Sequence, residues 1–149
     1  MSNLDWNDTY MSFAKGVAMH SKAEKAKVGC VIVKDNQVIS TGYNGTPPGY
    51  DNTCEDTMFA SDVMITRPEV VHAEINAITK VAQSTVSCHK ASLYVTKVPC
   101  WECCKAIIMS GIKVVVFEGT AEDIESEPVA FLQLNKVIVI AMNNGGYLV

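Results

Sequence analysis

The sequence predicts an α/β fold in which one mixed β-sheet carries helices on both faces. Residues 28–34 and 37–43 are β-branched runs joined by Asp35-Asn36, a pair typical of a tight turn, so they should form a hairpin. After residue 70, helical and strand patterns alternate along the chain. Such alternation is typical of strands that lie side by side with helices packed across them.

The N-terminal part should hold one helix before the hairpin and one long loop after it. Residues 5–20 repeat large apolar side chains at helical spacing, and Asp5 is a candidate N-cap. Residues 44–56 are dense in Gly, Pro, Asn and Asp, which favours an irregular loop. Long ordered loops often carry function.

The C-terminal part should alternate helices and strands. Helices are expected at residues 71–82, at 100–110 with Gly111 as the terminator, and at 124–134, where Pro128 starts or interrupts the helix. Strands are expected at residues 92–97, 112–117 and 137–142. Residues 57–68 show no clear pattern.

The composition indicates one globular domain over residues 1–149. The chain is 48% apolar and 19% charged. Its longest apolar runs, 114–117 and 137–142, are far shorter than the roughly 18–20 residues that span a bilayer. Asp5 and Asp8 stand where a signal peptide would need a basic flank. We therefore expect a cytoplasmic protein that has no membrane partner.

The charge of the chain favours a small substrate. A net charge of −4 argues against a general nucleic-acid binder, because such proteins neutralise phosphates with a surplus of Lys and Arg. Four lysines are nevertheless concentrated near the hairpin, at Lys15, Lys22, Lys25 and Lys27. They form either a solvated face or a local phosphate site.

Two short motifs carry the chemistry of a metal site. In a reducing compartment thiols stay reduced, so clustered cysteines indicate a metal or a catalytic site. Cys100 and Cys103 stand one helical turn apart behind Pro99, which points both sulfurs to the same side. His72 opens the preceding helix and supplies a third ligand. Three protein ligands leave the fourth zinc position open for water, as in a catalytic site.

Glu74 is the candidate catalytic group. It lies two residues after His72 and can accept a proton from the metal-bound water and pass protons to the substrate. His-x-Glu followed by Pro-Cys-x-x-Cys is the established signature of zinc-dependent cytidine and adenosine deaminases.

The other cysteines and histidines are weaker candidates for metal ligands. Cys104 also lies within a turn of Cys100, but the spacing of Cys103 is commoner in metal sites, and Cys104 is read as a buried apolar thiol. The remaining candidates show no ligand spacing and are read as structural: Cys54, Cys88, His89 and His20. We therefore expect one zinc ion per chain.

Beyond these motifs, a longer part of the chain resembles the deoxycytidylate (dCMP) deaminase family. The resemblance covers roughly residues 11–117 and is strongest to phage and bacterial members. It is carried by Lys-Val-Gly-Cys-Val-Ile-Val, by Gly-Tyr-Asn-Gly-Thr-Pro-Pro-Gly, by Cys-Glu-Asp and by His-Ala-Glu-Ile-Asn-Ala-Ile. It implies the three-layer α/β/α fold of cytidine deaminases, with a central five-stranded sheet, and hydrolysis of dCMP to dUMP for thymidylate synthesis.

The resemblance also implies roles for individual residues. Asn44 would hold the sugar, and the backbone of Ala73 would read the edge of the base. The phosphate would lie near Ser21, Lys25 and Lys27. Relatives tend to offer a tyrosine to this phosphate after the fourth strand, but the present chain has Phe117 followed by Glu-Gly-Thr. Phosphate binding should therefore depend more on the lysines.

Regulation is implied as well. Many relatives are activated by dCTP and inhibited by dTTP at a site in the Gly-Tyr-Asn-Gly-x-Pro loop, and commonly assemble as hexamers. The corresponding residues here are Gly42, Asn44, Gly45, Gly49 and Asn52. Glycines let the backbone approach a triphosphate closely. Mg²⁺ could accompany the triphosphate. The alternative for this loop is a plain surface turn.

Two other functions remain open at this point. One is a deaminase that acts on another cytosine or adenine nucleoside or on a nucleic acid, which the net charge and the lysines oppose. The other is a structural zinc module for protein contacts, which a fourth protein ligand would support.

Overall fold

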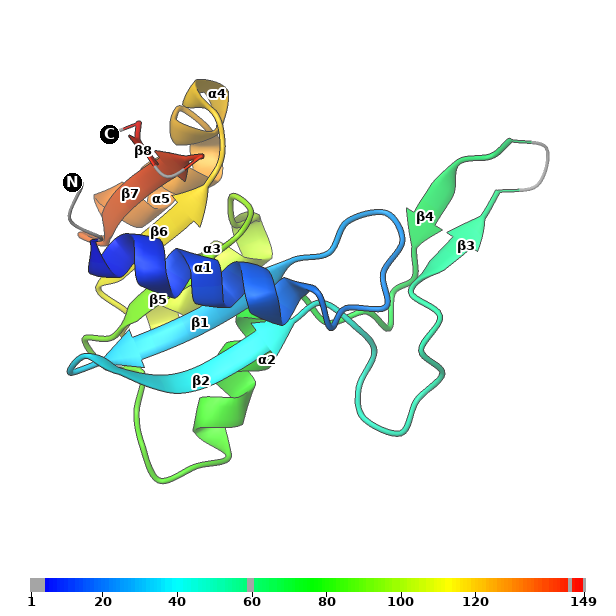
Figure 1. The fold of residues 1–149 in the computed structure, drawn as a ribbon, viewed down its shortest axis with the longest axis horizontal. Coiled ribbons are helices and arrows are strands. Elements are labelled where there is room, and N and C mark those ends of the chain that lie inside the picture. The colour runs from blue at the N-terminus through cyan, green and yellow to red at the C-terminus, as the bar shows by residue number, and fades with distance from the viewer. Residues whose placement is uncertain (1–4, 59–60, 145, 149) are drawn as a thin grey trace.

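The computed structural model describes residues 5–58, 61–144 and 146–148, and its centre is a six-stranded sheet (Figure 1). In spatial order the strands are β2 (Gln37–Tyr43), β1 (Gly29–Lys34), β5 (Ser92–Val95), β6 (Val114–Glu118), β7 (Ile138–Asn143) and β8 (Gly146–Tyr147). Neighbours β5, β6 and β7 run parallel, while β1 is antiparallel to β2 and to β5. The predicted mixed sheet is thus confirmed. The expected number of five strands was wrong, because the short β8 pairs with β7.

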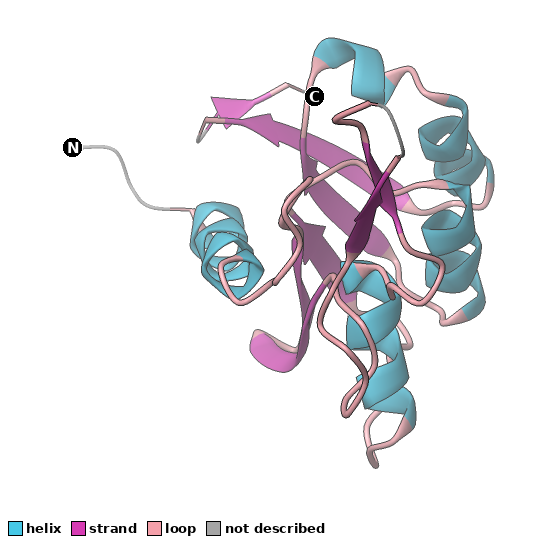
Figure 2. Ribbon diagram, turned by 90° about the vertical axis from the view of Figure 1, so that its right-hand side faces the viewer, coloured by secondary structure: helices cyan, strands magenta, loops and turns pink. Residues whose placement is uncertain are grey.

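Helices cover both faces of the sheet, as predicted (Figure 2). One face carries α1 (Trp6–Ala18), and the other carries α2 (Ala73–Ala82), α3 (Trp101–Met109) and α5 (Glu127–Leu134). Alternation along β1 explains the division, because successive side chains of a strand point to opposite faces. Val31 and Val33 pack under α1, whereas Cys30 and Ile32 belong to the larger core beneath α2, α3 and α5.

The turn of the β1–β2 hairpin matches its sequence. Asp35 and Asn36 both have positive φ, at 53° and 59°. This backbone twist fits the twist of the two strands, and Asn and Asp tolerate it better than most residues.

Two glycines of this hairpin bring a helix against each face of the sheet. A Cβ at Gly29 would lie 2.6 Å from the amide nitrogen of Ala18 in α1. A Cβ at Gly42 would lie 2.6 Å from the amide nitrogen of Ala77 in α2. No side chain fits at either position, so both helices contact the hairpin backbone directly.

A hairpin arm projects from the body of the molecule (Figure 1). It consists of β3 (Glu55–Thr57) and β4 (Met64–Thr66), which pair antiparallel. The expected irregular loop over residues 44–56 was therefore wrong at its end, where Glu55 and Asp56 are strand residues. The base of the arm is held by Arg67, whose backbone amide donates to Cys54 and whose guanidinium donates to the carbonyl of Thr53.

The C-terminal helical segment consists of two helices. The short α4 (Ala121–Ile124) begins at a Thr120 capping box, and α5 begins with Pro128 in its first turn. Pro128 thus starts a helix, since a proline at this position lacks only an N–H that would be unpaired in any case.

The C-terminal strand is tied to the start of α1. Asp5 caps α1 by accepting from the amide of Asn7, as predicted. The Tyr147 hydroxyl donates to Asp5 and accepts from the Asn7 side chain, and Tyr94 donates to Asn7 over 2.6 Å. None of the helices described is long and apolar enough to cross a membrane.

Candidate metal centre and pocket

Three side chains from two helix N-termini converge on one point. His72 is the N-cap of α2, Cys100 is the N-cap of α3, and Cys103 lies in the first turn of α3. His72 Nδ1 lies 3.5 Å from Cys100 Sγ and 3.4 Å from Cys103 Sγ. The three ligand atoms all lie within 4.8 Å of one another.

These distances fit a tetrahedral zinc ion. With zinc bonds of about 2.3 Å to sulfur and 2.0–2.1 Å to nitrogen, tetrahedral geometry separates the two ligand atoms by about 3.5 Å. The helix N-termini also favour thiolates, because free backbone N–H groups point toward them. The donor set therefore suits zinc, and the His72, Cys100 and Cys103 that the motif predicted are brought together.

Glu74 lies beside these ligands and is only 4% exposed. Burial raises the pKa of its carboxyl, although hydrogen bonds from its own amide and from the Cys103 thiol oppose the shift. Burial, together with Glu74 and Cys100, also raises the pKa of the Cys103 thiol. The Glu74 carboxyl and the Cys103 thiol, which become anionic when they lose a proton, are thus buried next to each other. A cation bound beside them would stabilise their anionic forms.

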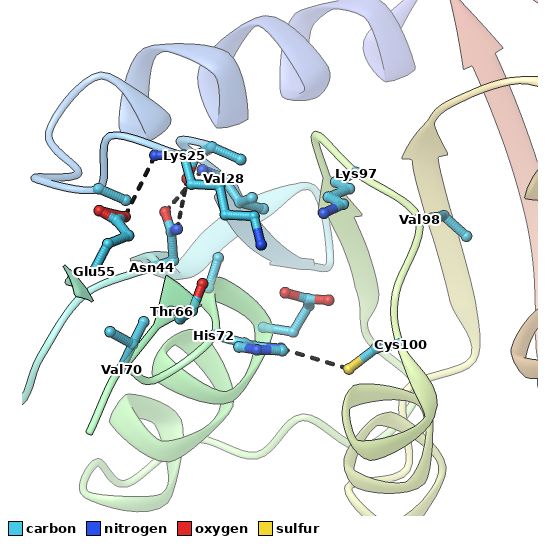
Figure 3. Close-up of a pocket in the computed structure, with 14 residues that line it drawn as sticks. Lys25, Val28, Asn44, Glu55, Thr66, Val70, His72, Lys97, Val98 and Cys100 are labelled. Atoms are coloured by element: carbon cyan, nitrogen blue, oxygen red, sulfur yellow. Dashed lines mark hydrogen bonds between the residues drawn. The ribbon is translucent and has the colours of Figure 1, made fainter. Parts of the chain in front are cut away.

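Two of the ligands, His72 and Cys100, line a pocket of about 170 Å³ together with Glu74 (Figure 3). Ala73, Asn44 and Lys25 also line it, so three of the residues implied to bind substrate share a pocket with two of the metal ligands. The Lys25 side chain points into this pocket. Ser21 and Lys27 are not among its lining residues.

Asn44 and Ser21 are both anchors of the loop between α1 and β1. The Asn44 amide accepts from the backbone of Val28 and donates to the carbonyl of Ala26, each over 2.8 Å. Ser21 is 2% exposed, accepts from the amide of Ala23 and donates to the carbonyl of Asn44.

Two charged pocket residues were missed from the sequence. Lys97 follows β5 and extends into the pocket from the side opposite Lys25, and Glu55 reaches it from the arm (Figure 3). Lys97 stands three residues before Cys100, so its nearness to the metal motif was the available signal. Glu55 stands in the Cys-Glu-Asp motif, but nothing local placed it in the pocket, to which tertiary structure brings it.

The residues implied to bind an effector are spread along one segment. Gly42 lies within β2, and Gly45 follows Asn44 and bonds through its backbone with Val71. Gly49 has a φ of 83°, which favours glycine. Asn52 lines a second cavity of about 290 Å³ at the base of the arm.

Cys104 is adjacent to Cys103 but faces elsewhere. Its thiol points to the carbonyl of Pro99 at 3.8 Å, and burial raises its pKa to about 12. This is the buried thiol that the sequence predicts.

A family model and several known proteins match this chain. Residues 4–119 match the family model of the cytidine and deoxycytidylate deaminase zinc-binding region. The chain is 37% identical over 126 residues to a deoxycytidylate deaminase of Mycobacterium phage D29, covering 78% of this chain and 97% of that protein. It is 35% identical over 130 residues to ComE operon protein 2 of Bacillus subtilis, covering 87% of this chain but only 66% of that protein.

A solved structure is similar over nearly the whole chain. It is the dCMP deaminase of the cyanophage S-TIM5 in complex with dCMP and dUMP. The TM-score is 0.82 at 31% identity, and the match covers 95% of this chain and all of that one.

Proposed function

The chain belongs to the cytidine and deoxycytidylate deaminase family, and on that premise we propose that it hydrolyses dCMP to dUMP and ammonia, which would supply thymidylate synthesis. One observation carries the proposal. Three metal-ligand side chains converge beside the buried Glu74, and two of them line a pocket with Glu74 and two lysines. The names of the phage relatives support dCMP as the substrate.

His72, Cys100 and Cys103 would hold one zinc ion. When bound, the ion lowers the pKa of a water ligand and so supplies a nucleophile at neutral pH. Glu74 would take the proton of the attacking water on its carboxylate and transfer it to N3 of the cytosine. It would then take the second proton of that oxygen and deliver it to the 4-amino group, which leaves as ammonia.

The other pocket residues would orient the nucleotide. The backbone of Ala73 would read the edge of the base, and Asn44 would contact the sugar. The ammonium of Lys25 would bind the phosphate, assisted by the field of Lys27. Ser21 would act on this site through the loop that it anchors, since it does not line the pocket.

The test is ammonia release from dCMP, dCTP, deoxycytidine and CMP, measured side by side. We expect dCMP to be preferred. Charge reversal by Lys25→Glu should raise the KM for dCMP and leave the slow reaction of deoxycytidine unchanged, because only the phosphate contact is lost. Lys27→Glu should have a smaller effect in the same direction. Equal turnover of dCMP and deoxycytidine would contradict the assignment and indicate a nucleoside deaminase.

Regulation by dCTP as activator and dTTP as inhibitor is a further part of the proposal. The effector would bind with Mg²⁺ at Gly42, Asn44, Gly45, Gly49 and Asn52, in a homo-hexamer. Because Asn44 also lines the pocket, an effector that moves it would change substrate affinity.

Gly45→Val tests this regulation. A Cβ at Gly45 would meet only the ring of Tyr43, at 3.8 Å, so the variant should fold. We expect the wild type to respond to both nucleotides with sigmoidal kinetics and the variant to lose the response. Hyperbolic kinetics of the wild type, indifferent to both nucleotides, would contradict regulation.

We also propose that residues 1–149 form one deaminase domain in a reducing compartment, the cytoplasm. In support, β7 lies outside the range of the family match yet belongs to the same sheet. All six cysteines are free, and the metal site requires its two in reduced form.

A further inference from the structure

The loop between α1 and β1 carries Lys25 into the pocket without regular secondary structure. Its backbone amides nevertheless bond to side chains. Ser21, in the loop itself, accepts from Ala23, and Asn44, at the end of β2, accepts from Val28. A third acceptor holds the middle of the loop, and it comes from the arm.

That acceptor is Glu55. Its carboxylate accepts from the amide of Glu24 over 3.0 and 3.1 Å. It also accepts from the amide of Lys25 over 3.4 Å (Figure 3). Hydrogen bonds to an ionised group are stronger than those between neutral groups. Glu55 therefore fixes the backbone from which the Lys25 side chain extends.

The Lys25 ammonium is left available by this arrangement. Glu55 holds Lys25 through the backbone, and within the described residues the Lys25 ammonium makes no ion pair. The side chain points into the pocket, as Lys97 does from the other side. A fixed cation binds an anion with less loss of conformational entropy than a mobile one.

The arm that carries Glu55 is stabilised at its base by a charged cluster around Arg67. Arg67 is the only arginine of the chain. It pairs with Asp51, Asp56 and Glu69 at 3.6–3.8 Å and donates to the carbonyl of Thr53. Glu55 pairs in register with Thr66, the residue before Arg67. The backbone of Glu55 is thus fixed by the β3–β4 pairing and by the ion pairs of Arg67.

From these contacts we infer that Glu55 is a positioning residue for the substrate phosphate, acting through the backbone of Lys25. The inference rests on the proposed function, because it assigns Lys25 to the phosphate of dCMP. Among the described residues, the Glu55 carboxylate bonds to the loop amides and to none of the metal ligands. Its loss should therefore weaken phosphate recognition and leave the chemical step unchanged.

The kinetic test compares Glu55→Ala with Asp56→Ala. The two carboxylates are neighbours on β3, but Asp56 contacts Arg67 and not the loop. We expect Glu55→Ala to raise the KM for dCMP roughly tenfold, the usual effect of a lost charge-assisted contact, with kcat unchanged. Asp56→Ala should leave KM near the wild-type value, because Arg67 keeps Asp51, Glu69 and the Thr53 carbonyl as partners and the arm stays in place. Glu55→Gln retains an acceptor oxygen and should recover part of the loss.

A double-variant cycle separates positioning from general damage. In a Lys25→Ala background, Glu55→Ala should add almost nothing to the KM for dCMP, because the cation that it positions is gone. Hydrogen exchange gives a readout independent of activity, and the amides of Glu24 and Lys25 should exchange faster in Glu55→Ala.

Several results would overturn the inference. If the wild type turns over dCMP but Glu55→Ala leaves KM unchanged, Glu55 does not position the phosphate site. An equal rise of KM in the Lys25→Ala background would show that Glu55 does not act through Lys25. If the wild type does not turn over dCMP at all, the proposed function is wrong and this inference falls with it.

Discussion

The hydroxyl of Ser21 donates to the backbone carbonyl of Asn44 over 2.7 Å. This bond joins the start of the α1–β1 loop to the end of β2. Two residues that the family resemblance associates with substrate are therefore bonded to each other, and one of them, Ser21, does not line the pocket. The loop and the strand end form one unit.

Ser21→Ala should weaken both the fold and substrate binding. The change leaves the Asn44 carbonyl and the Ala23 amide without their partner in a buried place, at a cost of about 1–3 kcal/mol in the free energy of unfolding. The KM for dCMP should rise, although Ser21 does not touch the pocket. Urea unfolding and steady-state kinetics measure the two effects. Ser110→Ala, which removes a similar bond to Ile107 far from the pocket, should leave KM unchanged.

The neighbouring cysteines of α3 should differ in their effect on zinc. Cys103→Ser removes a ligand from the converging group, so we expect the purified protein to lose most of its zinc. Cys104→Ser alters a thiol that faces the carbonyl of Pro99, so zinc content should remain near one per chain. Metal analysis of both variants decides the matter, and full zinc in Cys103→Ser would exclude that residue as a ligand.

Glu74→Gln should separate metal binding from turnover. The amide has nearly the shape of the carboxyl but cannot accept and return a proton, so kcat should fall about 10²–10⁴-fold. Zinc content should be retained, because Glu74 is not among the converging ligands. A buried neutral amide also avoids the cost of a buried charge, so the variant should unfold no more easily than the wild type. Near-normal turnover would mean that another group moves the protons.

Gly42 should tolerate no side chain, whereas Gly16 should accept one. A Cβ at Gly42 would collide with the backbone of α2, so Gly42→Ala should lower the free energy of unfolding by about 1–3 kcal/mol and shift His72 and Glu74. Gly16 lies on the exposed side of α1 with open space around it, so Gly16→Ala should raise stability by about 0.5–1 kcal/mol. Thermal unfolding of both variants tests the contrast. A harmless Gly42→Ala would contradict the close contact.

Tyr94 should give a pH dependence on the alkaline side. Burial, reinforced by Tyr10 and Asp5, raises its pKa from 10.0 to about 12. The folded state thus holds the phenol proton more tightly than the unfolded chain. The contribution of Tyr94 to the free energy of unfolding is therefore complete below about pH 10 and is lost as the pH rises through about 12. Phenolate absorbance and the free energy of unfolding, both measured from pH 8 to 12, test this dependence. Tyr94→Phe should flatten that part of the curve.

Much of the architecture could be predicted from local pattern. The β-branched runs of β1 and β2 and the helical spacing of α1 are strong periodic signals, and the turn at Asp35 and Asn36 has its own chemistry. The metal cluster could be predicted as well, because the spacing of Cys100 and Cys103 follows directly from one helical turn.

The arm and the pocket walls could not be predicted in the same way. The strands of the arm are three residues long and show no alternation of apolar and polar residues, since neither face packs into the core. β8 has two residues and exists only through pairing with β7. Glu55 and Lys97 reach the pocket from separate segments, and although Lys97 lies near the metal motif, no local feature predicts that the two residues share a pocket.

The position of β1 in the sheet has a consequence for the order of folding. Cys30 pairs with Gly42 on one side, close along the chain, and with Val95 on the other, far along it. The first pairing closes a short loop and is fast, while the second must close a long one and is slow. Because Cys100 and Cys103 follow β5, the complete ligand set requires the pairing that is distant along the chain. Zinc binding therefore depends on long-range contacts and not on the hairpin alone.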